Sequence, residues 1–137
     1  MRHLLAAILL TILSALSLPA TAQPSRYLIS AQPMRDAPSG IQAWRVQYWT
    51  TNGDGQRFAV TGIIAAPMEA IPPRPRRVIA WTHGAWGVAE KCAPSLSPDF
   101  FAYTAGMDAV RSGYVVGAPD YIGLATPTVD PFLAGPH

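Results

Sequence analysis

In the stretch Val78-Ile-Ala-Trp-Thr-His-Gly-Ala-Trp-Gly87, an apolar run stops abruptly at a His-Gly-x-x-Gly turn. Residues 78–82 do not alternate between apolar and polar types, which is typical of a strand buried on both faces in a parallel sheet. The small residues of the turn allow the backbone to approach a ligand closely. The stretch therefore predicts a buried strand followed by a turn that presents backbone N–H groups.

The segments on either side complete a mixed sheet. Alternating side chains over 44–49 and 58–64 flank the turn Asn52-Gly-Asp-Gly55, a pattern that predicts an antiparallel hairpin. After an irregular stretch over 89–96, Ser97-Pro-Asp99 is a good helix start. An apolar stripe predicts a helix that ends near Gly113; its members are Phe100, Tyr103, Met107 and Val110. A strand over 114–118 then closes a βαβ unit, so the fold class is α/β.

The N-terminus resembles an export signal. A basic start precedes the apolar run from Leu4 to Leu18, and Ala20-Thr-Ala22 has the small-x-small pattern of a cleavage site. The run is shorter than the roughly 20 residues that span a bilayer, although an uncleaved anchor stays an alternative. We expect a signal peptide over 1–22, an extended lead-in over 23–42, a partial domain over 43–137 and a secreted or periplasmic location.

Composition excludes several function classes. The formal net charge of +2 leaves no basic face for nucleic acid. No metal-ligand spacing and no Gly-rich phosphate loop occur, so we expect no metal and no cofactor. The single cysteine, Cys92, predicts either a free thiol or a disulfide with a cysteine further downstream.

Two motifs together resemble the secreted lipase family of α/β-hydrolases. They are Trp81-Thr-His-Gly-Ala-Trp-Gly-Val-Ala-Glu-Lys-Cys-Ala-Pro-Ser95 and Gly113-Tyr-Val-Val-Gly-Ala-Pro-Asp-Tyr-Ile-Gly123. The resemblance covers about residues 43–135 and implies the N-terminal part of an α/β-hydrolase sheet, with an antiparallel hairpin and then a βαβ unit. One departure is Gly117, where the family has a bulkier residue.

The resemblance implies a serine hydrolase whose catalytic groups are not in this sequence. In the family, a Ser on a Gly-x-Ser-x-Gly elbow, then Asp, then His form a triad. The chain contains no Gly-x-Ser-x-Gly, so we expect no catalytic triad residue here. The implied substrate is a small-molecule or lipid ester, and contact with a lipid surface is an accompanying expectation.

Six residues are the candidates for a site. Gly84, Ala85 and Trp86 are expected to supply N–H donors to an oxyanion hole, with an ordinary turn as the alternative. His83 precedes any nucleophile, so we expect it to hold the loop by a hydrogen bond and not to transfer protons. Asp120 is expected to brace its loop through backbone N–H groups. Trp86 and Tyr121 are candidates to line the substrate site, although Tyr121 could instead pack on the sheet.

Two other functions stay open. An exported peptidase of the same fold would use the same N–H donors on an amide. A short, non-catalytic exported protein would also lack a nucleophile, but a single helix over a four-stranded sheet would leave apolar faces exposed. In either the fragment or the non-catalytic case, we expect the chain alone not to hydrolyse esters.

Overall fold

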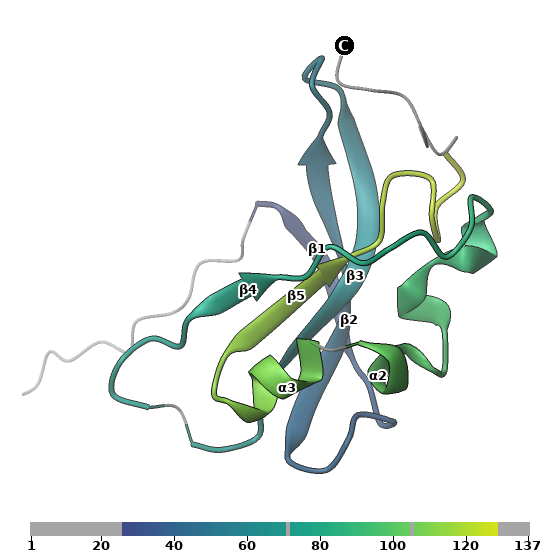
Figure 1. The fold of residues 1–137 in the computed structure, drawn as a ribbon. Helices are drawn as coiled ribbons and strands as arrows, with labels where there is room; N and C mark the ends of the chain where they lie inside the picture. The colour runs from purple at the N-terminus through teal and green to yellow at the C-terminus, as the bar shows by residue number, and fades with distance from the viewer. Residues whose placement is uncertain (1–25, 71, 105, 129–137) are drawn as a thin grey trace, which may run out of the picture.

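The computed structural model describes residues 26–70, 72–104 and 106–128. They form a five-stranded mixed sheet in the order β1-β2-β3-β5-β4, with two short helices on one face (Figure 1). The expected signal peptide over 1–22 and the tail from residue 129 lie outside the described residues. None of the helices in the described ranges is long and apolar enough to cross a membrane.

The predicted hairpin is confirmed. Strands β2 (Ile41–Thr51) and β3 (Arg57–Pro67) pair antiparallel over their whole length. The Asn52 side-chain oxygen accepts hydrogen bonds from the backbone N–H groups of Asp54 and Gln56, at 3.1 and 2.9 Å. Gly55 takes a φ of 79°, so the turn uses a conformation that favours glycine.

The segment expected as an extended lead-in over 23–42 contributes to the sheet. Strand β1 (Leu28–Pro33) pairs antiparallel with β2, and β2 itself begins at Ile41. All six residues of β1 are exposed, so no alternation of buried side chains marked it in the sequence. Backbone hydrogen bonds to β2 hold this edge strand in place.

The predicted βαβ unit is confirmed, because β4 (Val78–Ala80) and β5 (Val115–Pro119) are parallel neighbours. The prediction that residues 78–82 are buried on both faces is wrong. Within the described residues β4 is an edge strand paired only with β5, and the Val78 side chain is 72% exposed. The backbone pairing continues one residue further, where the N–H of Trp81 donates to the Gly117 carbonyl at 2.7 Å.

The single predicted helix is instead two, α2 (Phe100–Tyr103) and α3 (Gly106–Arg111). Thr104 is extended, with φ −100° and ψ 105°, and its hydroxyl donates to the Phe100 carbonyl at 2.6 Å. This local bond competes with the helical pattern and ends the first helix. Tyr103 is 76% exposed and does not belong to the buried stripe. Gly113, with φ 94°, follows α3 as predicted.

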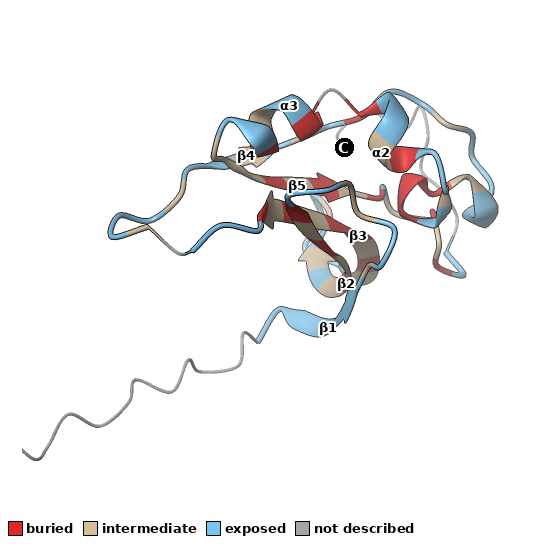
Figure 2. Ribbon diagram, turned by 90° about the horizontal axis from the view of Figure 1, so that it is seen from below, coloured by how far each residue is buried: buried red, intermediate tan, exposed pale blue. Residues whose placement is uncertain are grey.

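Two single-turn 3-10 helices, η1 (Glu90–Cys92) and η2 (Pro94–Leu96), occupy the stretch expected to be irregular. The core lies between the helices and one face of the sheet (Figure 2). It consists of Ile41, Ala43, Ile63, Ala65, Phe100, Met107, Val110, Val116 and Ala118. This packing fixes β5 and β3 under the helices and so positions the loops that leave their ends.

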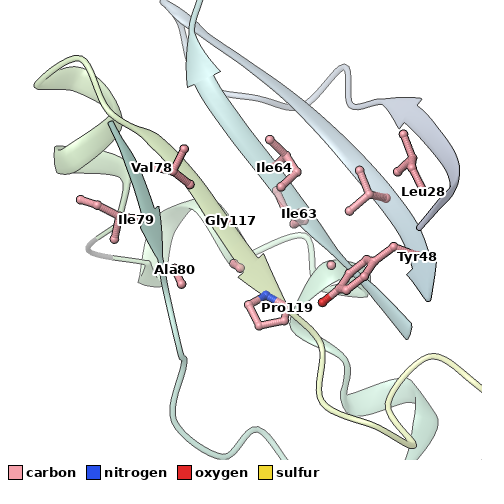
Figure 3. A pocket seen from close by; sticks show the side chains of 12 residues that line it. Leu28, Tyr48, Ile63, Ile64, Val78, Ile79, Ala80, Gly117 and Pro119 are labelled. Atoms are coloured by element: carbon pink, nitrogen blue, oxygen red, sulfur yellow. The ribbon is translucent and has the colours of Figure 1, made fainter. Parts of the chain in front are cut away.

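An apolar hollow of about 360 Å³ lies over the sheet (Figure 3). Leu28 comes from β1, Tyr48 from β2, Ile64 from β3 and Pro119 from the end of β5. Neither Trp86 nor Tyr121 belongs to its lining. The hollow is therefore separate from the turn that the sequence singled out.

Candidate functional site

The turn after β4 and the loop after β5 lie together. Both segments leave the carboxyl ends of parallel strands, which meet at one edge of the sheet (Figure 1). The Tyr121 hydroxyl, in the loop after β5, donates a hydrogen bond to the His83 carbonyl at 2.6 Å. Its ring stacks on the His83 ring with 4.4 Å between centroids. The structure thus brings together five of the predicted site residues, because Gly84, Ala85 and Trp86 belong to the same turn as His83.

Two consecutive carbonyl groups in this turn are held by side chains. The His83 carbonyl accepts from Tyr121, and the Gly84 carbonyl is 2.7 Å from Nδ1 of His83. A peptide unit is planar, and every peptide in the described ranges is trans. The N–H at the far side of each unit must therefore point away from the anchored carbonyl. The two anchors fix the directions of the Gly84 and Ala85 N–H groups.

These N–H groups are available to a ligand. In the part of the chain that the structure describes, the backbone N–H groups of Gly84, Ala85 and Trp86 have no acceptor. Gly84 and Ala85 are exposed, and Trp86 is partly buried. Unpaired N–H groups with fixed directions, at the carboxyl edge of a sheet, are the arrangement that stabilises a negatively charged oxygen.

The two glycines of the turn have different roles. A Cβ atom on Gly84 would meet nothing within 4 Å. Gly87 has a φ of 123°, and a Cβ there would lie 2.5 Å from Sγ of Cys92. The fold therefore requires glycine at position 87, whereas the space beside Gly84 is open to a ligand.

Asp120 connects the loop after β5 to two other elements. Its side chain is 2% exposed, and Oδ1 accepts from the Ser95 backbone N–H at 3.0 Å. Oδ2 accepts from the Thr61 hydroxyl at 2.5 Å, and Nε of Arg45 donates to the Ser95 carbonyl at 2.8 Å. Strands β2 and β3 and helix η2 are thus tied to the end of β5.

Sequence reasoning missed three members of this network: Thr61, Ser95 and Arg45. The available signal was Thr61, which is the one polar residue in the run from Phe58 to Ala66. A polar side chain in a buried run usually has a hydrogen-bonding partner. The partner itself could not have been identified, because it lies 59 residues further along the chain.

The charge of Asp120 affects the pKa of Tyr48. Burial raises the pKa of the Tyr48 phenol above its ordinary value of 10.0, and the negative charge of Asp120 raises it further. Both effects favour the neutral phenol, which suits a side chain that lines the apolar hollow. Tyr48 is therefore a reporter of the Asp120 charge.

His83 has no free nitrogen for proton transfer in this arrangement. Its side chain is buried, Nδ1 faces the Gly84 carbonyl, and Nε2 lies 3.0 Å from the Pro119 carbonyl. The Trp86 ring meets the His83 ring edge-on, with 6.5 Å between centroids. Trp86 therefore packs against the residue that holds the turn, and Tyr121 is 38% exposed beside it.

No group of three potential metal ligands occurs within residues 26–70, 72–104 and 106–128. Cys92 is a free, partly buried thiol, and the sequence has no second cysteine to pair with it. The disulfide expected for Cys92 therefore stays a prediction about residues outside this sequence.

Comparisons with known proteins identify the architecture. No protein-family model and no curated protein sequence matches the chain. The structure is similar to Candida antarctica lipase A, with a TM-score of 0.52 and 20% identity, over 69% of this chain and 25% of that one. The chain has part of an α/β-hydrolase sheet. The closed state of the same lipase gives a TM-score of 0.51 at 21% identity, with the same coverage.

A further similar structure is the acetyl xylan esterase from Paenibacillus sp. R4, with a TM-score of 0.48 and 20% identity, over 74% of this chain and 28% of the esterase. The chain spans about a quarter of the length of these enzymes. The likeness to the lipase, at 20% identity, establishes the fold alone, and the chemistry has to be argued from the turn itself.

Proposed function

We propose that the turn over residues 83–87 is the oxyanion-hole segment of an exported serine hydrolase that acts on acyl esters. The observation that carries the proposal is the pair of anchored carbonyls, which directs the N–H groups of Gly84 and Ala85; these groups and the Trp86 N–H are unpaired within the described residues. Attack on an ester carbonyl forms a tetrahedral oxyanion, and preorganised N–H donors stabilise it. The similar fold of Candida antarctica lipase A supports an ester substrate.

The chain's own residues would bind and orient, and residues beyond this sequence would supply the nucleophile and base. His83 and Tyr121 hold the donors in position through the two carbonyls. Asp120 holds the loop that carries Tyr121. A serine, aspartate and histidine from a longer product would complete the reaction in the order usual for this fold.

The decisive experiment compares the 137-residue chain with the product of the reading frame extended past codon 137. Both are incubated with p-nitrophenyl esters of short and long acyl chains and with a fluorophosphonate probe. The proposal expects hydrolysis and labelling only in the extended product. Labelling of a serine in the 137-residue chain, or an inactive extended product, would contradict it.

A variant of the extended product tests the donors directly. Ala85→Pro removes the Ala85 N–H, and loss of one oxyanion donor lowers kcat by about 10²–10³. Pro73→Ala, at an exposed residue of the loop before β4, is the control and leaves kcat unchanged. Parallel assays on peptide anilides distinguish an esterase from an exported peptidase of the same fold. A stop codon directly after the His137 codon would favour the short, non-catalytic protein.

A further inference from the structure

The His83 ring lies between two hydrogen-bond acceptors. Nδ1 is 2.7 Å from the Gly84 carbonyl oxygen, and Nε2 is 3.0 Å from the Pro119 carbonyl oxygen. A carbonyl oxygen accepts and never donates, so each ring nitrogen must carry a hydrogen for both bonds to form. Neutral imidazole carries one such hydrogen, whereas imidazolium carries two. The arrangement is complete only when the ring is positively charged.

The two carbonyls belong to different segments of the fold. Gly84 lies in the turn after β4, and Pro119 is the last residue of β5. Beyond the strand pairing, the last backbone bond between these segments runs from Trp81 to Gly117. The doubly protonated ring therefore extends the connection between the parallel strands to the turn itself.

The surroundings of the His83 ring suit a positive charge, although no carboxylate is paired with the ring in the described ranges. The face of the Tyr121 ring stacks on it, with an interplanar angle of 29°, and aromatic faces attract cations. The Tyr121 hydroxyl is occupied with the His83 carbonyl. The nearby acid in sequence, Asp120, is occupied with Ser95 and Thr61. In the described ranges the ring nitrogens thus face only carbonyl oxygens.

We propose that His83 is a positioning residue that clamps the turn to the end of β5 in its doubly protonated form, which makes the turn dependent on pH. Loss of the Nε2 proton breaks the longer of the two contacts, which is the one that joins the turn to β5. A nitrogen lone pair then faces the Pro119 carbonyl, and the two acceptors repel each other. The ring and the turn separate from β5, while the bond from Nδ1 to Gly84 stays.

This inference does not depend on the proposed function. It concerns the geometry of the turn, which can be measured in the 137-residue chain without any catalytic group. If the proposed function also holds, the N–H donors are best positioned while both ring nitrogens of His83 carry a hydrogen. An inactive extended product would leave the clamp untouched, so the two ideas fail separately.

The test is a pH titration of the chain, with ¹⁵N-labelled histidine and backbone amides, followed by NMR. Comparison with His83→Gln assigns the His83 signals, because His3 and His137 remain in that variant. We expect Nδ1 of His83 to stay protonated and Nε2 to lose its proton. The amide signals of Gly84 and Ala85 should move with the same midpoint, and His83→Gln should abolish that movement.

Amides of the β2–β3 hairpin serve as the internal reference, because they lie in a long antiparallel ladder. The proposal is overturned if the Gly84 and Ala85 signals do not follow His83, if Nε2 keeps its proton while Nδ1 loses it, or if the hairpin signals move with the same midpoint. The titration of the unmodified chain decides these outcomes even if the glutamine variant unfolds.

Discussion

Replacing Asp120 tests the network that holds the carboxyl edge of the sheet together. The carboxylate is 2% exposed and accepts from the Ser95 N–H and the Thr61 hydroxyl. In Asp120→Ala both donors lose their acceptor, the Ser95 N–H where it is buried and the Thr61 hydroxyl where it is partly buried. Leaving a buried donor unpaired costs about 1–3 kcal/mol, so the free energy of unfolding should fall by roughly 2–6 kcal/mol.

Asp120→Asn distinguishes the effect of the hydrogen bonds on stability from the effect of the negative charge on the Tyr48 pKa. The amide oxygen still accepts from one donor, but the amide nitrogen faces the other, so we expect about half of the alanine loss. The negative charge disappears as well. The pKa of Tyr48 should therefore move back toward 10.0, while burial, which is the larger cause of its elevation, keeps the pKa above that value.

Urea unfolding followed by tryptophan fluorescence measures the stability, and ultraviolet titration of the phenols measures the Tyr48 pKa. Asp54→Ala is the control, because Asp54 is an exposed residue of the β2–β3 turn and its loss should stay within about 0.5 kcal/mol. The reasoning is refuted if Asp120→Ala costs no more than this control. It is also refuted if the Tyr48 titration is the same in Asp120→Asn.

Three further predictions concern the turn, the hollow and the N-terminus. Gly84→Ala should change the free energy of unfolding by less than about 0.5 kcal/mol, whereas Gly87→Ala, which clashes with Cys92, should cost about 1–3 kcal/mol in urea unfolding. The pKa of Tyr48 is raised in the folded protein, so above about pH 10 the unfolded state ionises first and the stability that the neutral phenol contributes is lost. Above that pH, Tyr48→Phe should therefore be harder to unfold than the unmodified chain. Secreted or periplasmic material should begin at Gln23 on N-terminal sequencing, and a retained Met1 in a membrane fraction would contradict export with cleavage.

The sequence predicted the fold correctly wherever the pattern of apolar and polar side chains agrees with the backbone conformation of the segment. The alternation on each side of Asn52-Gly-Asp-Gly55 predicted the hairpin because both strands have unlike faces. The parallel pairing of β4 and β5 followed from the helix between them. Gly113 was predicted to follow the helix, and its positive φ agrees with that placement.

The errors arose where tertiary contacts outweigh local pattern. The apolar run at 78–82 has the composition of a central strand, yet within the described residues β4 has a neighbour on one side only. The stripe of apolar residues from Phe100 to Val110 predicted one helix, but Thr104 prefers a local hydrogen bond to the helical conformation. Strand β1 was missed because its place in the sheet depends on backbone pairing with β2.

In the candidate site, too, local sequence predicts only part of the structure, because the functional groups are backbone atoms. The motif His-Gly-x-x-Gly predicted where the N–H groups would be, but their directions depend on side chains that hold the carbonyls on the same peptide units. One anchor is local, from His83 to its neighbour Gly84, and the other comes from Tyr121, 38 residues later. The same motif without a tyrosine at the end of β5 would leave the His83–Gly84 peptide unanchored. Tyr121→Phe should therefore weaken the turn without altering any residue of the motif.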